Sequence, residues 1–119
     1  MIAKLFDSEL RIMNHLWNEG DMTAAQLVKI LKQEVGWNKN TTYTVIKKCI
    51  EKGAIERTEP NFMCRAIIPK EDVCEYETTE LISKLFNGSA DLFLASYVNG
   101  KNLTSAQIIR LKELIEELK

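Results

Sequence analysis

Trp37-Asn38-Lys39-Asn40-Thr41-Thr42-Tyr43-Thr44-Val45-Ile46-Lys47-Lys48-Cys49-Ile50-Glu51-Lys52-Gly53 has the pattern of an amphipathic helix that faces two different environments. A helix turns about 100° per residue, so positions three and four apart share one face. The apolar face comprises Thr42, Val45, Ile46 and Cys49, which predicts a stripe toward the core. The opposite face carries Asn40, Thr44, Lys47 and Lys48, with Thr41 at the edge of the first turn. Such groups can hydrogen-bond DNA bases and phosphates, although a solvated helix face has the same composition.

Two helices are predicted before this segment. Asp7 can cap the first, which ends at Gly20. Thr23 followed by Gln26 fits a capping box that opens the second helix, and Gly36 closes it. Because only a few residues separate the second and third helices, their spacing is typical of a helix-turn-helix.

A β-hairpin is predicted after the third helix, which Gly53 ends. Residues 54–58 and 62–68 read as two short strands on either side of the turn at residues 59–61. Three helices followed by a hairpin are the order of a winged helix-turn-helix domain. We therefore assign residues 1–70 to a DNA-binding domain of this class.

The remaining residues, 71–119, are predicted to form three helices and a second domain. Its middle helix, residues 90–98, is apolar nearly all round and needs burial on every side. A segment of this size is near the lower limit for a free-standing core. We therefore expect a dimerisation domain, with the alternative that these helices fold back on residues 1–70. The residues expected at the dimer interface are Leu92, Phe93, Tyr97, Ile108, Leu111, Ile115 and Leu118. The expected fold is thus mainly α with a small β-hairpin wing.

Composition and charge restrict the class of protein. The chain has 119 residues, 45% apolar and 28% charged, which is ordinary for a soluble globular protein. No apolar run approaches the roughly 20 residues of a membrane span, and residues 1–7 lack a signal-peptide pattern, so a cytoplasmic protein without a membrane partner is expected. Residues 1–70 carry 11 Lys and Arg against 8 Asp and Glu, whereas residues 71–119 carry 5 against 9. A net +3 half joined to a net −4 half suggests two functional segments.

No catalytic or metal site is predicted, so we expect a protein that is not an enzyme and has no cofactor. Cys49, Cys64 and Cys74 are widely spaced and form no C-x-x-C pair. His15, the only histidine, has no acidic or cysteine partner at ligand or triad spacing, and no glycine-rich phosphate loop is present. Cys49 is expected to be buried, and Cys64 and Cys74 to be more exposed.

Several motifs along the chain share one register with a known family. They are Leu10-Arg11-Ile12-Met13-Asn14-His15-Leu16-Trp17, Thr23-Ala24-Ala25, Trp37 before Thr41-Thr42-Tyr43-Thr44, Lys52-Gly53-Ala54-Ile55, Leu85-Phe86-Asn87-Gly88-Ser89 and Leu103-Thr104. With these motifs nearly the whole chain resembles the penicillinase-repressor (BlaI/MecI) family of winged-helix regulators, related to the copper-responsive CopY repressors. The resemblance implies a homodimeric transcriptional repressor whose helix at residues 40–52 enters the major groove of a palindromic, double-stranded DNA operator. It also implies control of an antibiotic-resistance or stress-response gene.

The resemblance also suggests individual roles. Contacts to DNA are expected from Lys39, Asn40, Thr41, Thr44, Lys47 and Lys48, with Arg57 and Arg65 of the hairpin near phosphate. Family members that respond to β-lactams are inactivated by a sensor protease at an Asn-Phe bond. The corresponding pair here is Ser96 and Tyr97, so a proteolytic site is placed there although the bond itself differs. The C-x-C pairs of the copper-responsive relatives are absent, and no metal is expected.

Two other functions stay open at this point. A winged helix can serve as a protein-interaction module that binds no DNA. Alternatively, oxidation of Cys49 on the core stripe of the third helix would displace that helix, which would make the protein a redox-sensing regulator.

Overall fold

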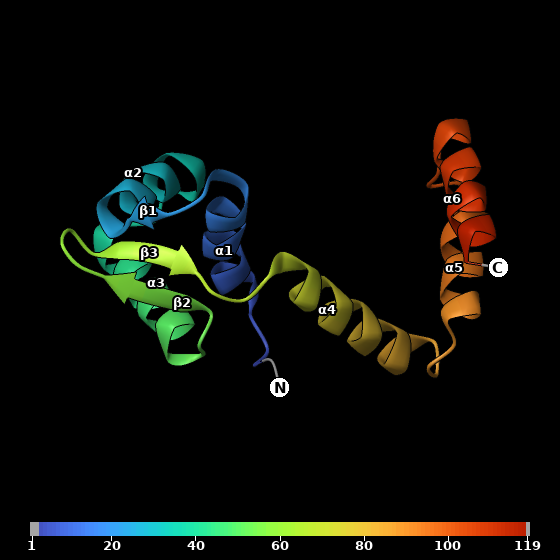
Figure 1. Cartoon of the computed structure of the whole chain (residues 1–119), viewed down its shortest axis with the longest axis horizontal. Coiled ribbons are helices and arrows are strands. Elements are labelled where there is room, and N and C mark those ends of the chain that lie inside the picture. Colours follow the sequence, from blue (N-terminus) through green and yellow to red (C-terminus); the bar gives the residue numbers. More distant parts are fainter. Residues whose placement is uncertain (1–2, 119) are drawn as a thin grey trace. The chain divides into compact units, whose positions relative to one another are not determined.

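The computed structural model describes residues 3–118, which form six α-helices and three short β-strands (Figure 1). They fall into two compact units, one ending at Tyr76 and the other beginning at Glu77. The predicted domain boundary, between residues 70 and 71, lies at the start of α4 (Lys70–Leu85), and the two units divide further along the same helix. Each unit is described on its own below.

The first helix, α1 (Asp7–Glu19), begins differently from the prediction. Phe6 rather than Asp7 occupies the N-cap position, and Asp7 is the first helical residue. The Phe6 amide donates to Glu9 Oε1 at 2.7 Å. Capping at this helix is therefore carried by the acid of the third helical position, because the residue before the helix has no polar side chain.

The next two helices begin and end as the sequence indicates. At the start of α2 (Ala24–Val35), the Thr23 amide donates to Gln26 Oε1 at 2.8 Å, and the Gln26 amide donates to Thr23 Oγ1 at 3.2 Å. This confirms the predicted capping box. Gly36 ends α2 with a left-handed φ of 73°, which glycine adopts without steric cost. Asn38 then caps α3 (Lys39–Glu51), so the helix-turn-helix is closed within three residues.

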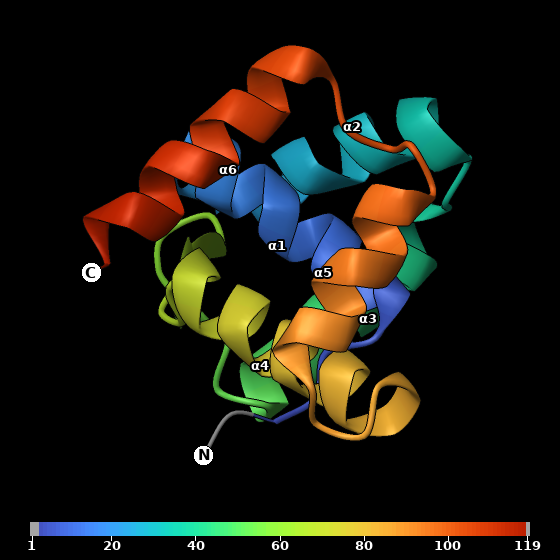
Figure 2. The same ribbon diagram turned by 90° about the vertical axis from the view of Figure 1, so that its right-hand side faces the viewer.

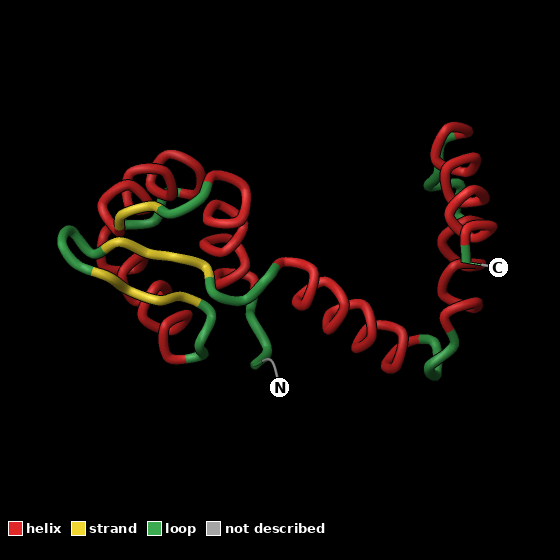
Figure 3. The backbone as a smooth tube through the Cα atoms, in the orientation of Figure 1, coloured by secondary structure: helices red, strands yellow, loops and turns green. Residues whose placement is uncertain are grey.

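A three-stranded antiparallel sheet completes this unit, in the order β1-β3-β2 (Figure 3). The predicted hairpin is confirmed as β2 (Ile55–Thr58) and β3 (Met63–Ala66), and its loop projects from the edge of the unit (Figures 1 and 3). The additional strand, β1 (Met22–Thr23), pairs with Cys64 and Met63 of β3. This strand was not predicted, because two residues are too few to show a two-residue alternation.

The core of the first unit lies between the three helices and the sheet. All four residues of the predicted α3 stripe are buried, which confirms its orientation. The largest fully buried apolar side chains come from α1, α2, α3 and β2: Ile12, Met13, Leu27, Leu31, Ile46 and Ile55. Trp17 and Trp37 are half-buried against this core, and the Trp17 indole donates to the Ile68 carbonyl at 2.9 Å. The position of α3 is thus fixed along its whole length.

The second unit contains the end of α4 together with α5 (Ala90–Asn99) and α6 (Ser105–Glu117). Ser89 caps α5, and the Thr104–Gln107 capping box opens α6. Helices α5 and α6 diverge from the loop that joins them (Figure 2). No residue between Glu77 and Leu118 is buried.

Candidate nucleic-acid interface

The polar face of α3 is fully available to a ligand. Every residue predicted to contact DNA from this helix is exposed: Lys39, Asn40, Thr41, Thr44, Lys47 and Lys48. Between Lys39 and Lys48 the sequence contains three lysines and no carboxylate. A face of hydroxyl, amide and ammonium groups can bind phosphates and base edges. The structure brings these predicted site residues together on one helix.

Thr44 already has a defined orientation on this face. Its hydroxyl donates to the Asn40 carbonyl one turn earlier, at 2.8 Å. Because the hydroxyl hydrogen is used within the helix, the oxygen is available mainly as an acceptor. An acceptor beside a methyl group can contact the amino group of adenine or cytosine and the methyl group of thymine.

A charge pair fastens the end of α3 to the beginning of α1. Lys52 Nζ lies 2.6 Å from Glu9 Oε1 and donates to the Lys4 carbonyl at 2.7 Å. The same ammonium lies 4.3 Å from the centroid of the Phe6 ring. Glu9 is only 1% exposed, so this pair is largely desolvated and holds α3 firmly in position. Sequence analysis missed the pair because the two residues are far apart along the chain.

The hairpin presents its two arginines differently. Strand register places Arg57 opposite the buried Cys64, and Arg65 opposite Glu56 on the other face. The Arg57 guanidinium lies 3.7 Å from the Phe62 ring centroid, and Arg57 Nη2 lies 2.6 Å from Glu59 Oε1. Hydrogen bonds from the Phe62 amide and from Arg57 lower the pKa of Glu59. A phosphate contact from Arg57 would have to replace this pair, whereas Arg65 is exposed on the outer face.

An aromatic contact joins the hairpin loop to α3. The rings of Tyr43 and Phe62 meet edge to face with centroids 5.5 Å apart. Lys39, one helical turn before Tyr43, places its Nζ 5.9 Å from the centroid of the Tyr43 ring. In addition, the Ala24 amide donates to the Phe62 carbonyl at 2.9 Å. Through Phe62, the loop of the wing thus contacts both α2 and α3, the two helices of the helix-turn-helix.

The cysteines differ in exposure from the prediction at one position. Cys49 is buried and Cys74 exposed, as expected, but Cys64 is buried because its side of β3 faces the core. Burial, followed by the nearby Glu9 carboxylate, raises the pKa of Cys49 to about 12. Burial also raises the pKa of Cys64 to about 11. Since the thiolate is the reactive form, neither buried thiol is suited to sensing oxidants at neutral pH.

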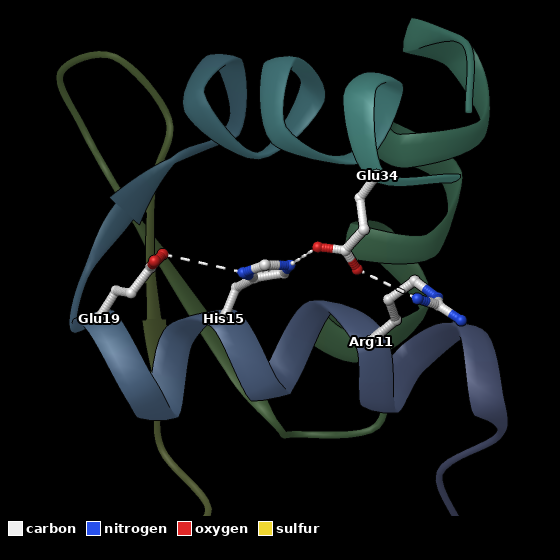
Figure 4. Close-up of polar contacts among 4 residues, drawn as sticks. All are labelled: Arg11, His15, Glu19 and Glu34. Carbon is white, nitrogen blue, oxygen red and sulfur yellow. Dashed lines mark hydrogen bonds and ion pairs between the residues drawn. The ribbon is translucent and has the colours of Figure 1, made fainter. Parts of the chain in front are cut away.

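His15 has acidic partners that the sequence analysis did not find. His15 Nε2 lies 2.9 Å from Glu34 Oε2 of α2, and Arg11 Nη1 donates to the other oxygen of Glu34 at 3.1 Å (Figure 4). Glu19, one turn further along α1, lies 3.8 Å from His15 Nδ1. Glu34 was not predicted as a partner of His15, because it approaches the imidazole only in the folded chain. Among residues 3–118 no group of three His, Cys, Asp or Glu side chains could hold a metal ion.

The residues predicted for a dimer interface remain largely uncovered. Five of them are exposed: Leu92, Tyr97, Ile108, Ile115 and Leu118. Leu111 and Phe93 are half-buried, and the Phe93 ring packs against Phe86 with centroids 5.5 Å apart. The predicted proteolytic pair, Ser96 and Tyr97, is exposed within α5. In the part of the chain that the structure describes, no helix is long and apolar enough to cross a membrane.

The arrangement of the first unit defines a class of protein. Three helices, a tight turn between α2 and α3, and a β-hairpin behind α3 form a winged helix-turn-helix. The solution structure of the DNA-binding domain of the repressor BlaI has this fold and matches 60% of the chain, and 90% of that domain, with a TM-score of 0.56 and 24% identity. The predicted fold class is confirmed.

Comparison of the whole sequence identifies the family. The family model for the penicillinase repressor matches residues 5–117. The chain is 22% identical to the penicillinase repressor of Bacillus licheniformis, over 99% of this chain and 94% of that one. It is 21% identical to the methicillin resistance regulatory protein MecI of Staphylococcus epidermidis, over 96% and 94% of the two chains. The chain therefore belongs to the penicillinase repressor family, whose members are transcriptional repressors rather than enzymes.

Proposed function

We propose that this protein is a homodimeric transcriptional repressor that binds a two-fold symmetric DNA operator through α3. The observation that carries the proposal is the exposed face of α3, which combines three lysines with hydroxyl and amide groups and lies on a firmly held helix. Rigid placement is what allows a few side chains to read base edges, because misplaced donors lose their hydrogen bonds. The proposed target is a gene for antibiotic resistance or stress response, by analogy with the named relatives.

The individual roles follow from the geometry of the face. Thr44 accepts from a base and contacts a thymine methyl group, while Asn40 and Thr41 contact bases or phosphates. Lys39, Lys47 and Lys48 bind phosphates as point charges, since a lysine lacks the paired donors with which arginine grips one base. Arg65 supplies a phosphate contact from the wing, and Arg57 does so only if it leaves Glu59.

A second copy of the chain is supported by the state of the second unit. Large apolar side chains are exposed on all three of its helices, among them Leu85 at 70%, Leu92 at 54% and Ile115 at 53%. A two-fold dimer would cover these side chains and would link two α3 helices. Linked binding sites raise affinity by orders of magnitude without any new contact, which suits a face with only three cations. Cleavage of the Ser96–Tyr97 bond by a sensor protease would sever α6 from this unit and release the operator.

The two alternatives are less well supported. A protein-interaction module would present an apolar centre on its contact surface, whereas the outer face of α3 is polar and cationic. A redox sensor would need a reactive thiol on α3, but Cys49 is buried with a raised pKa.

Selection from random duplex DNA tests the proposal. The full-length protein is incubated with a random-sequence library, and the retained duplexes are sequenced. We expect a palindromic consensus whose half-sites are centred about ten base pairs, or a multiple of this, apart. A variant with Lys39, Lys47 and Lys48 all changed to Glu should retain no duplex. Its control changes Lys84, Lys101 and Lys112 to Glu, which alters the net charge equally within the second unit. The proposal is wrong if the wild-type protein enriches no sequence, or if both triple variants bind alike.

Thr44→Ala tests base readout within the same experiment. The variant should lose discrimination at one base pair in each half-site, at a cost of about 1–3 kcal/mol in binding free energy. Fluorescence anisotropy with the selected operator and its single-base variants measures this loss. If the variant keeps the wild-type preference at every position, Thr44 is not a reading residue.

A further inference from the structure

A hollow lies between the first turn of α1 and the outer face of α3. Its volume is about 490 Å³. It is lined by Ser8 of α1, by Trp37 and Asn38 of the helix-turn-helix turn, and by Asn40, Thr41, Thr44, Val45 and Lys48 of α3. We refer to it as the α1–α3 hollow. It brings a residue from the beginning of the chain, Ser8, beside the proposed reading residues.

The chemistry of the α1–α3 hollow favours an anion. No carboxylate lines it, and Lys48 supplies a positive charge. Asn38 Oδ1 accepts from the Thr41 amide at 2.8 Å, so the donating end of that side chain, the amide nitrogen, remains for a ligand. The hydroxyls of Ser8 and Thr41 can donate as well. The lining thus combines one cation with several neutral donors, which is the usual composition of a phosphate contact.

A second hollow on α1 shows that this composition is particular to one side of the helix. It is lined by Asp7, Leu10, Arg11, Asn14, His15, Asn18 and Glu34, and its volume is about 420 Å³. There the carboxylate of Glu34 already pairs with Arg11 and His15. Of these two hollows on α1, the α1–α3 hollow is the one without an acidic residue in its lining, and it is the one that adjoins the reading face.

We infer that the α1–α3 hollow binds one phosphate of the DNA backbone at the border of the major groove, with Ser8 and Lys48 as its ligands from two different helices. The inference rests on the proposed function, because the same face of α3 must approach DNA. A phosphate held from α1 as well as from α3 fixes how the reading helix is oriented in the groove, without reading sequence itself. Ser8 is then a positioning residue for DNA recognition that sequence analysis did not single out.

Ser8→Asp tests the site, with Asn14→Asp as its matched control. Both variants add one carboxylate to α1, but Ser8 lines the α1–α3 hollow whereas Asn14 lines the other hollow. A carboxylate in the first turn of a helix is favourable, so Ser8→Asp should fold normally. We expect it to weaken the binding of full-length protein to the selected operator by roughly tenfold or more, through repulsion of the phosphate. Binding to random duplex DNA should weaken by the same factor, and Asn14→Asp should bind as the wild type does.

Ser8→Ala and Lys48→Ala measure whether the two residues share one phosphate. Each should weaken binding alone, Ser8→Ala by about two- to tenfold for a single lost hydrogen bond. Their effects should be less than additive in the double variant, because removal of either ligand already loosens the phosphate.

The outcomes separate this inference from the proposed function. Equal affinities of Ser8→Asp and Asn14→Asp would overturn the phosphate site while leaving the operator-binding proposal intact. A loss on operator but not on random duplex would also overturn it, because it would make Ser8 part of base readout. If wild-type protein binds neither duplex, the proposed function fails and the phosphate site fails with it.

Discussion

The two units of this chain are built from similar local elements but differ in what they bury. Fifteen apolar residues are buried in the first unit, from Leu5 to Val73, whereas none is buried between Glu77 and Leu118. Most large apolar side chains that remain exposed belong to the second unit: Leu81, Leu85, Leu92, Leu94, Tyr97, Val98, Ile108, Ile109, Leu114, Ile115 and Leu118. The first unit therefore has a hydrophobic core of its own. The second unit has large apolar side chains, but they are not buried.

Local helix chemistry does not explain this difference. The same capping box opens α2 and α6, with Thr23 and Gln26 in one unit and Thr104 and Gln107 in the other. In α2, Leu27 and Leu31 are fully buried in a core cluster to which α1, α3 and the sheet also contribute. In the second unit α5 and α6 diverge (Figure 2), and the described residues of this unit contain no strand. The units therefore differ in how far neighbouring elements bury their apolar side chains, and not in how their helices form. A second copy of the chain would bury the apolar side chains of the second unit.

The largest effect is expected from the same truncation made in each unit. Leu27 is fully buried, so Leu27→Ala should lower the free energy of unfolding of the first unit by about 2–5 kcal/mol at any protein concentration. Leu114 is 38% exposed, and Leu114→Ala should act mainly by weakening the dimer. Urea unfolding followed by circular dichroism at two protein concentrations distinguishes these cases. Only the transition of the second unit should move to higher urea as the concentration rises. Transitions independent of concentration in both units would contradict the comparison.

Leu111→Asp should break the dimer and so remove the link between two α3 helices. We expect a monomer in sedimentation equilibrium and an affinity for operator lower by about a hundredfold, since the gain from linkage is lost. Ser105→Asp is the control, because it adds the same charge at an exposed position in the first turn of α6. A Leu111→Asp variant that still sediments as a dimer would place the interface elsewhere.

The contrast between the units also shows what could be predicted from the sequence. The core stripe of α3, the capping box of α2 and the hairpin depend on neighbours within a few positions, and these were predicted, whereas the cap of α1 was assigned to Asp7 and is at Phe6. Pairs formed only by the fold were missed, such as Lys52 with Glu9 and His15 with Glu34. The burial of Cys64 was missed because the pattern of β3 does not show which of its sides faces the core. The exposed residues of the candidate interface were predicted because polar residues on an amphipathic helix lie opposite its apolar stripe.

Charge pairs provide a smaller test of the same contrast. Lys52→Met leaves the buried Glu9 carboxylate without its cation, and we expect a loss of about 2–3 kcal/mol in unfolding free energy. This is below the 3–5 kcal/mol of a fully buried pair because Lys52 is 23% exposed. In the second unit Arg110 lies 3.9 Å from Glu113 with both side chains exposed, so Arg110→Met should cost less than about 1 kcal/mol. Thermal unfolding of both variants measures the difference, and equal losses would show that Glu9 is not truly desolvated.

The smallest effect is expected at the exposed ion pairs that Glu34 of α2 forms with Arg11 and His15 of α1. Hydrogen bonds from Arg11, followed by the charge and hydrogen bond of His15, lower the pKa of Glu34 from 4.5 in spite of partial desolvation. A carboxyl group with a lowered pKa stabilises the folded chain above its unfolded pKa, and this contribution disappears as the pH falls through the folded pKa. Glu34→Gln should therefore lower the melting temperature of the first unit slightly near neutral pH, and the difference from wild type should vanish in acid. Because Glu34 is exposed, the shift should be much smaller than that of Leu27→Ala. A difference that persists unchanged in acid would assign the role of Glu34 to packing rather than to its charge.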